Sequence, residues 1–386
     1  MDGSGAKRPT HLAHHGKHMR IGIDCRLSGK KHAGLGRYTE NLVKELLTSS
    51  KNESSEFILF FTDTTQAEEV IPKKTISNYK IVLTPIKHYS LPEQIFLPLY
   101  FYKENLDLLH VPHFNISLFY LKPLVVTIHD LLWHEKRGSG VTTLHPFVYW
   151  IKYLFYHLVT GSAVSRSKAI FVPSQTVATT VIKHYPHTEK KIVITKEGTQ
   201  LHTPSSFPKR KANQLLYVGS LYPHKNIQLV IDALKKMPKL QLVIVGARNV
   251  FQKKVESYVK DRNLQNRVSF KGYVTDTELQ KLYLESTALV QPSLSEGFGL
   301  TGLEALGLQT PVLASDIPIF HEIYENAALY FDPHSVESFM KAYTNLSKQS
   351  TQSFIRRANA IVNDFSWKKM AAMTYKTYTS IHETEK

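Results

Sequence analysis

Short apolar runs recur along the whole chain, and most are followed by a polar or glycine-containing stretch and then by a segment with helical spacing. Unbroken apolar runs of this kind are typical of strands buried on both faces of a parallel sheet. Because strands and helices alternate, the pattern predicts an α/β protein with parallel sheets. We expect strands at residues 19–25, 57–61, 80–83, 108–111, 124–128, 169–173, 191–195, 214–219, 240–246, 267–273, 288–291 and 311–315.

The series of strands and helices is interrupted at residues 202–212. This segment, HTPSSFPKRKA, is polar, contains two prolines and carries a basic run, as interdomain linkers often do. A length of 386 residues also favours two domains. We therefore predict one domain over residues 19–201, a second over 213–364 and a C-terminal helix over 365–386. Residues 1–18 are polar and rich in histidine, which predicts a disordered tail or tag without a role of its own.

Composition and charge narrow the class of protein. The hydrophobic fraction of 42% supports buried cores, and the single cysteine, Cys25, excludes a disulfide framework and fits a reducing compartment. We find no signal peptide and no apolar run of about 18 residues, so we expect a cytoplasmic protein without a membrane-spanning helix. The net charge of +16 suits nucleic acid, anionic lipid or phosphorylated substrates. Since we find no DNA- or RNA-binding motif, we do not expect nucleic acid as a partner.

The stretch that points most directly to chemistry is PSLSEGFGLTGLEALGLQTPVLAS, residues 292–315, which follows a predicted strand. Gly297 and Gly299 allow the backbone to approach a ligand closely, and the helix predicted next presents unpaired N–H groups that suit a diphosphate. Glu296 precedes this turn and Glu304 lies within the helix, so their carboxylates can accept hydrogen bonds from hydroxyl groups beyond the phosphates. This combination suits a nucleotide sugar. The alternative is an ordinary glycine turn beside a helix with a solvated glutamate.

Residues 292–333 resemble the donor-binding signature of glycosyltransferase family 4, whose members are retaining enzymes of the GT-B fold. The resemblance rests on two glutamates around a GFGL core and on TPVLAS; it departs from the family at Thr301-Gly302 and Leu308-Gln309. It implies two Rossmann-like domains that face each other across a cleft, with a C-terminal helix that crosses back to the first domain. It also implies donor-binding roles for Glu296, Gly297, Phe298, Gly299, Leu300, Thr301 and Glu304.

A glycine-rich segment after the first strand resembles a donor-facing element of the same family. The sequence SGKKHAGLGRY predicts a loop followed by a helix from about Tyr38. Gly34 and Gly36 would allow close approach to the donor, and Arg37 would supply positive charge. A merely flexible loop is the alternative.

The segment SLYPHKN after residues 214–219 resembles the family's Gly-Arg-Leu-x-x-x-Lys element. Ser220 stands in place of the arginine, and Lys225 matches the lysine, which can neutralise donor phosphate. We expect Ser220 and Lys225 at the donor site, with Arg37 as a candidate for the missing phosphate contact. A solvated lysine at the start of a helix is the alternative for Lys225.

Histidines follow two predicted strands that end at the same sheet edge. Family members carry a histidine that approaches the donor sugar at the position of His129, whereas a lone histidine is otherwise more often structural. We take His129, Glu296 and Lys225 as the candidate catalytic residues. His110, His113 and Asp130 are expected on the acceptor side.

The resemblance implies a glycosyltransferase that moves a sugar from a nucleotide diphosphate to a hydroxyl with retention of configuration. Helix ends, Lys225 and Arg37 would hold the diphosphate, so we expect no metal and no other cofactor. The segments HVPHFN, IHDLL and YPHKN look similar to mannosyltransferases of envelope polysaccharide synthesis. The alternatives are a nucleotide-sugar epimerase or hydrolase of the GT-B fold and a non-catalytic nucleotide-sugar-binding subunit.

The acceptor is expected to be a saccharide, lipid-linked and presented at the cytoplasmic face of a membrane. Two aromatic and apolar segments, residues 91–101 and 145–164, could contact an anionic leaflet peripherally, aided by basic charge. The alternative is that both segments belong to the core of the first domain.

Overall fold

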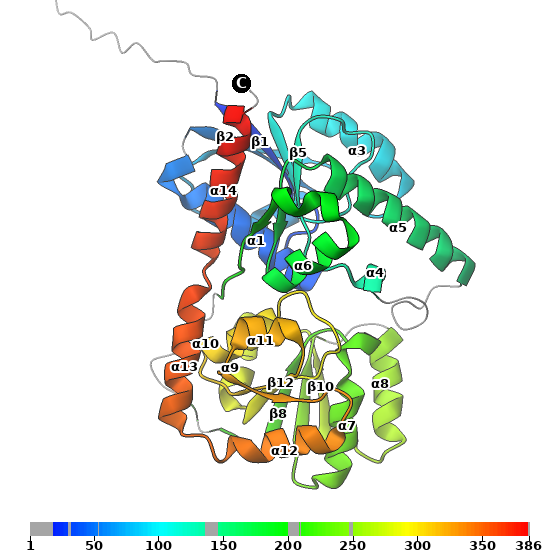
Figure 1. Cartoon of the computed structure of the whole chain (residues 1–386), viewed down its shortest axis with the longest axis vertical. Helices are drawn as coiled ribbons and strands as arrows, with labels where there is room; N and C mark the ends of the chain where they lie inside the picture. The colour runs from blue at the N-terminus through cyan, green and yellow to red at the C-terminus, as the bar shows by residue number, and fades with distance from the viewer. Residues whose placement is uncertain are drawn as a thin grey trace, which may run out of the picture.

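The computed structural model describes residues 18–29, 32–52, 54–135, 146–199, 208, 210–246 and 250–384. These residues form two parallel-sheet α/β domains, one above the other in Figure 1, which confirms the predicted fold class. Residues 1–17 of the predicted tail lie outside the described residues. The same holds for residues 202–207 and 209 of the predicted linker.

The first domain contains a seven-stranded parallel sheet of order β3-β2-β1-β4-β5-β6-β7. Its strands are almost entirely buried except for the edge strands β3 and β7, as unbroken apolar runs require. The strands are β1 (Met19–Asp24), β2 (Ser55–Phe61), β3 (Asn78–Leu83), β4 (Leu108–Val111), β5 (Leu124–Thr127), β6 (Ile170–Val172) and β7 (Ile192–Ile194). The helices are α1 (Ala33–Thr48), α2 (Thr64–Val70), α3 (Leu91–Lys103), α4 (Leu132–Glu135), α5 (Pro146–Arg166) and α6 (Gln175–His184).

The second domain repeats this plan with six parallel strands in the order β10-β9-β8-β11-β12-β13. In both sheets the strand order reverses beside the first strand, and open α/β sheets bind ligands at such a reversal. The strands are β8 (Gln214–Val218), β9 (Gln241–Val245), β10 (Val268–Gly272), β11 (Ala288–Gln291), β12 (Val312–Ser315) and β13 (Ala328–Phe331). The helices are α7 (Ile227–Lys236), α8 (Val250–Lys260), α9 (Asp276–Glu285), α10 (Leu300–Gly307), α11 (Pro318–Tyr324), α12 (Val336–Leu346) and α13 (Thr351–Asp364).

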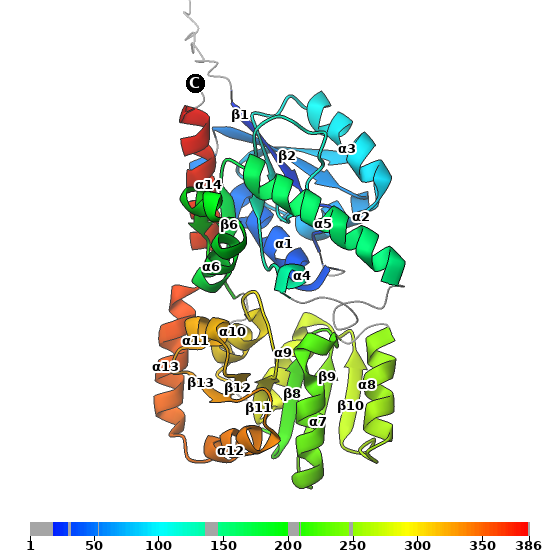
Figure 2. The same cartoon turned by 45° about the vertical axis from the view of Figure 1, so that its right-hand side comes forward.

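The last helix, α14 (Trp367–Thr384), leaves the second domain and packs along the first, as Figures 1 and 2 show. Trp367, Met370 and Tyr378 are buried in the same core cluster as Ile21 of β1 and Tyr38 of α1. The predicted crossing of the C-terminal helix to the first domain is therefore confirmed.

A second link between the domains involves α6 and α11. The backbone N–H groups of Gln175 and Thr176 donate to the two carboxylate oxygens of Glu322 at 2.6 and 2.8 Å. The Thr176 hydroxyl donates to the same carboxylate at 2.6 Å. A carboxylate from the second domain thus satisfies the helix N-terminus of the first, where unpaired N–H groups and the helix dipole favour negative charge.

Helix α1 begins earlier than the sequence predicts. The glycine-rich segment expected as a loop before Tyr38 forms the first turns of the helix, which starts at Ala33. A Cβ atom at Gly36 would collide with the Gly29 carbonyl, so the missing side chain lets the helix start close to the preceding turn. As a result, Arg37 projects from a helix.

Candidate active site

A cavity of about 1760 Å³ lies between the two domains, at the edges where the parallel strands end. Its lining contains all the predicted site residues except Gly36 and His110. The first domain contributes Gly34, Arg37, His113, His129 and Asp130. The second domain contributes Ser220, Lys225, Glu296, Gly297, Phe298, Gly299, Leu300, Thr301 and Glu304. Ligand pockets commonly measure about 300–1,000 Å³, so this cavity is larger than a single small ligand needs.

The glycines of the turn between β11 and α10 have separate structural roles. Gly299 occupies the N-cap position of α10 with φ of 100°, a conformation that L side chains rarely adopt. Gly297 lies against the other domain, since a Cβ there would collide with the His129 carbonyl, and its own carbonyl accepts from the Ser174 hydroxyl at 3.3 Å. The turn therefore places the N-terminus of α10 directly at the domain junction.

Glu296 forms an ion pair with Lys225 inside the cavity. The Lys225 Nζ atom lies 2.7 Å from Glu296 Oε1, and the Ser293 hydroxyl donates to the same oxygen at 2.8 Å. Burial raises the pKa of the Glu296 carboxyl, but the charge and hydrogen bond of Lys225 outweigh it, so the pKa lies below its ordinary value. Glu296 is therefore ionised at neutral pH.

Glu304 is almost fully buried and has partners from both domains. The Tyr283 hydroxyl donates to Glu304 Oε2 at 2.9 Å, while the Arg37 guanidinium pairs with Oε1 from across the cleft. The outer nitrogen of Arg37 also lies 3.9 Å from Asp276. Arg37, which was expected to contact a phosphate, is thus paired with Glu304, which was expected to contact a ribose.

His129 lines the cavity, but both of its ring nitrogens have protein partners. Nδ1 lies 3.2 Å from Glu197 Oε1 and Nε2 lies 3.3 Å from the Pro112 carbonyl oxygen. Glu197 and Pro112 therefore hold the His129 ring in its orientation at the cavity wall. The sequence analysis did not identify Glu197 as a site residue. Its position just after the end of a predicted strand, where site residues of parallel sheets lie, could have indicated it.

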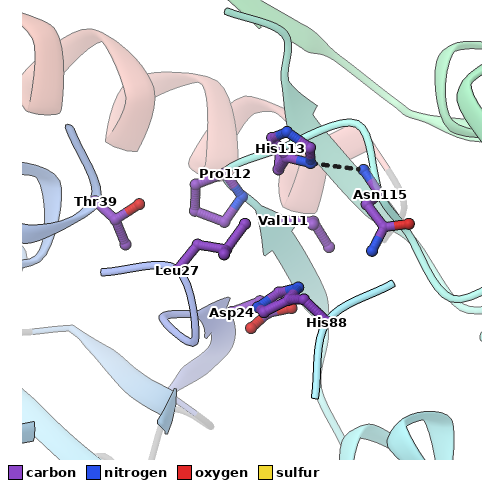
Figure 3. Close-up of a pocket in the computed structure, with 8 residues that line it drawn as sticks. All are labelled: Asp24, Leu27, Thr39, His88, Val111, Pro112, His113 and Asn115. Atoms are coloured by element: carbon purple, nitrogen blue, oxygen red, sulfur yellow. Dashed lines mark hydrogen bonds between the residues drawn. The ribbon is translucent and has the colours of Figure 1, made fainter. Parts of the chain in front are cut away.

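His113 lies at the cavity wall and also lines a small pocket of about 10 Å³, which Figure 3 shows. Its Nδ1 accepts from the Asn115 N–H at 3.2 Å. Burial, with smaller contributions from the charges of His129 and His88, lowers the pKa of His113 to about 3. His113 is therefore neutral at physiological pH, with its proton on Nε2.

His110 differs from the expectation of an acceptor-side residue. It is fully buried, and its ring nitrogens lie 2.5 Å from the Tyr378 hydroxyl and 2.8 Å from the Thr127 hydroxyl. Burial lowers its pKa to about 3. The position is that of a core residue that fixes α14 against β4 and β5, away from the cavity lining.

Metal independence stays a prediction. Among the described residues, no group of three His, Cys, Asp or Glu side chains is arranged to hold a metal ion. The lysine and arginine residues that line the described part of the cleft are Arg37, Lys225 and Lys253. Arg37 and Lys225 are the two that pair with the carboxylates of Glu304 and Glu296.

Family models match almost the whole chain. Residues 32–202 match the model described as Glycosyltransferase Family 4, and residues 200–363 match the model described as Glycosyl transferases group 1. The O-antigen chain mannosyltransferase RfbU of Salmonella typhimurium is 32% identical over 275 residues, which cover 70% of this chain and 72% of the relative. The O-antigen chain mannosyltransferase B of Escherichia coli is 24% identical over 376 residues, covering 89% and 95%.

Solved structures share the fold at low sequence identity. The Anabaena protein HepE, solved in complex with UDP and glucose, superposes with a TM-score of 0.71 at 18% identity. The match covers 94% of this chain and 100% of HepE. Together with the sequence matches, this shows that the chain belongs to the family 4 glycosyltransferases of the GT-B fold.

Proposed function

We propose that the protein transfers a hexose, most simply mannose, from a nucleotide-diphosphate sugar to a hydroxyl group of a lipid-linked saccharide, with retention of configuration. The observation that carries the proposal is the pairing of Lys225 with Glu296 and of Arg37 with Glu304 in one cavity. Two cations suit a diphosphate, and two carboxylates suit hydroxyl groups on either side of it. The names of RfbU and mannosyltransferase B support mannose, and the complex of HepE with UDP and glucose supports a nucleotide sugar.

In this arrangement the diphosphate lies at the N-terminus of α10, between Lys225 and Arg37. Glu304 accepts from the ribose hydroxyls, and Glu296 accepts from the hydroxyls of the transferred sugar. When the bond from the anomeric carbon to phosphate breaks, negative charge grows on the leaving diphosphate, and the two cations stabilise it. Glu296 is paired with Lys225 and is therefore not taken as a nucleophile. We infer that the acceptor hydroxyl attacks the anomeric carbon from the face that the diphosphate leaves. The proton of this hydroxyl passes to a phosphate oxygen.

A donor panel tests the proposal. The protein would be incubated with GDP-mannose, UDP-glucose, UDP-galactose and UDP-N-acetylglucosamine, with and without polyprenyl-diphosphate-linked saccharides, and released nucleotide and product would be measured by mass spectrometry. We expect release that depends on the acceptor and an α-linked product. Conversion of donor alone would indicate the epimerase or hydrolase. Binding without turnover would indicate the non-catalytic subunit.

Replacing Arg37 with alanine is expected to weaken the binding of nucleoside diphosphate without weakening the binding of nucleoside. Loss of a charged phosphate contact should weaken diphosphate binding about tenfold, since hydrogen bonds to charged groups contribute about 1.5–3 kcal/mol. The free nucleoside should bind at least as well as before, because Glu304 no longer has to release Arg37. Calorimetry with both ligands measures the difference. Equal weakening of both would contradict the exchange of partners.

The first domain carries a large exposed apolar surface, which we name the apolar face. The buried side of α5 packs on the domain through Tyr149, Tyr156 and Val159, but its opposite side is exposed. One side of α5 therefore belongs to the core of the domain, and the other side is exposed. The apolar face consists of Leu91, Ile95, Phe96 and Leu99 of α3, Phe119 and Leu121, and Phe147, Trp150, Ile151, Leu154 and Leu158 of α5.

The elements that carry the apolar face lie on one side of the domain and also carry basic residues. Helices α3 and α5 lie on the same side of the domain in Figures 1 and 2, and the segment between β4 and β5 bridges them. Tyr102 of α3 donates to the Phe119 carbonyl, and Arg166 of α5 donates to the Leu118 carbonyl. The basic residues include Lys103, Lys122 and Lys152, none of which is buried, whereas Glu93, an acid of α3, is buried.

An anionic bilayer surface complements such a face, since apolar side chains enter the headgroup region while lysines meet the lipid phosphates. Within the described residues, no helix combines the length and apolarity needed to cross a bilayer. We therefore propose peripheral contact through the apolar face, which would bring the cleft close to a lipid-linked acceptor.

Replacing Trp150 and Leu154 together with serine is expected to abolish most binding to liposomes. Each side chain is more than half exposed, and burial of such a side chain contributes about 1.5–3 kcal/mol. Sedimentation would compare anionic and neutral liposomes at low and high salt, with Met373→Ser on α14 as a control for an exposed apolar residue elsewhere. Wild-type protein that does not pellet preferentially with anionic liposomes at low salt would contradict the membrane contact.

A further inference from the structure

Tyr89, between β3 and α3, has an unusual backbone for an exposed aromatic residue. Its φ of 56° lies in the left-handed region, and its side chain is 58% exposed. Among the described residues, seven non-glycine residues have positive φ; four are asparagines, which tolerate this region, and Tyr89 is the aromatic one. A bulky residue persists in this conformation only where its surroundings impose it, and such strain often accompanies a functional site.

A buried carboxylate imposes the conformation. Glu93 Oε2 accepts from the Tyr89 N–H at 2.7 Å and from the Asn115 side chain at 2.9 Å. Glu93 Oε1 accepts from Arg26 at 2.9 Å, and Arg26 in turn pairs with Asp24 at 2.7 Å. Glu93 belongs to α3, Arg26 follows β1 and Asn115 follows β4, so three parts of the domain fix the backbone of Tyr89.

The Tyr89 ring stands beside groups that line the cavity. It packs edge-on against His113, with ring centroids 6.1 Å apart, and its hydroxyl lies 3.5 Å from His113 Nε2. His113 also packs on Phe114, with centroids 3.9 Å apart. Asp130 follows β5, and His113 follows the neighbouring strand β4. His113, Phe114 and Asp130 all line the cavity between the domains.

These groups have the chemistry of a saccharide site. A sugar ring presents an apolar C–H face and a rim of hydroxyl groups. The phenol of Tyr89 offers a rigid apolar surface with a polar end, which suits that face. Neutral His113 offers an N–H donor and Asp130 an acceptor, and a hydroxyl group can engage either one.

We propose that Tyr89 is the platform on which the acceptor saccharide stacks, with hydroxyl groups of that sugar bound by His113 Nε2–H and the Asp130 carboxylate. The proposal rests on the proposed transferase function and specifies its acceptor site. It makes Tyr89 a determinant of acceptor specificity without a role in donor binding.

The test uses three substitutions of Tyr89 and one control. Octyl glycosides of mannose, galactose and N-acetylglucosamine serve as probes, and their affinities are measured by NMR titration of the full chain in the presence of nucleoside diphosphate. Tyr89→Ala and Tyr89→Gly are expected to weaken binding of the preferred glycoside about tenfold or more, whereas Tyr89→Phe retains the ring face and most of the affinity. Tyr79→Ala, at the opposite end of β3, should have no effect.

Thermal unfolding separates recognition from folding. Because glycine adopts positive φ without strain, Tyr89→Gly should unfold at or above the wild-type temperature although it binds the glycoside poorly. A lower melting temperature with unchanged glycoside affinity would overturn the proposal, as would a wild type that binds none of the glycosides.

In the donor panel, a wild type that transfers sugar and a Tyr89→Ala variant with unchanged acceptor KM would overturn this inference alone. Absence of turnover with every donor would instead overturn the proposed function.

Discussion

Replacing Lys225 with alanine is expected to lower kcat about 100- to 1,000-fold, the effect typical of removing one donor that stabilises charge in a transition state. Lys225 lies in the 3₁₀ turn Pro223–Lys225, directly before α7, and its Nζ atom reaches the cavity beside Glu296. In the proposed reaction it faces the leaving diphosphate, where negative charge increases most. Its loss should therefore reduce turnover more than it reduces binding of the intact donor.

The pH profile of the Lys225 variant provides an independent readout. In the wild type Lys225 holds the pKa of Glu296 below its ordinary value, so Glu296 is ionised at neutral pH and its favourable contribution is lost only as the pH falls through that low value. Without Lys225, burial dominates and the pKa rises, so the acid limb of kcat/KM should move to higher pH. Lys236→Ala, which removes an exposed lysine of α7, is the matched control. Unchanged turnover in Lys225→Ala would contradict the assignment.

Replacing Glu304 with alanine is expected to weaken nucleoside diphosphate binding about 10- to 100-fold, because ribose hydroxyls lose a charged acceptor that contributes about 1.5–3 kcal/mol.

Glu296→Ala should instead weaken binding of the intact nucleotide sugar more than binding of the nucleoside diphosphate, since the Glu296 carboxylate faces the transferred sugar in the proposed reaction. Calorimetry with both ligands distinguishes the two carboxylates. Equal losses for both ligands in Glu296→Ala would refute the assignment of that residue.

Tyr283→Phe is the control for the Glu304 variant. It removes the hydroxyl that donates to Glu304 Oε2 but leaves the carboxylate and its pairing with Arg37 in place. We expect a small change in affinity. A loss as large as that of Glu304→Ala would mean that the orientation of the carboxylate, and not its charge, determines ribose binding.

The sequence predicted most of the architecture because local patterns determine it. Buried strands such as β2 and β12 are unbroken apolar runs, and the residues around Glu296 and Glu304 identify the family through a short continuous motif. Strand β13 (Ala328–Phe331) was missed, although it has the same length as strands β11 and β12, which were predicted. Parallel topology then brings most of the predicted site residues to the strand ends of the two sheets, which line the cavity between the domains.

What the sequence could not predict depends on contacts between distant residues. His110 lies within β4 and His129 just after β5, yet the first faces Tyr378 of α14 and the second faces the cleft. Glu197 and Tyr89 belong to no sequence motif. Glu197 is identified by its contact with His129, and Tyr89 by its hydrogen bond to Glu93. The exposure of Leu154 was also undetermined, because α5 is rich in apolar residues on both its buried and its exposed side.

The return of α14 to the first domain has a consequence for the order of folding during synthesis. Trp367, Met370 and Tyr378 belong to the core of the domain that leaves the ribosome first. Domains generally fold as units, the N-terminal one first. Here the N-terminal core stays incomplete until the C-terminal residues emerge, so the first domain to be made is the last to be finished.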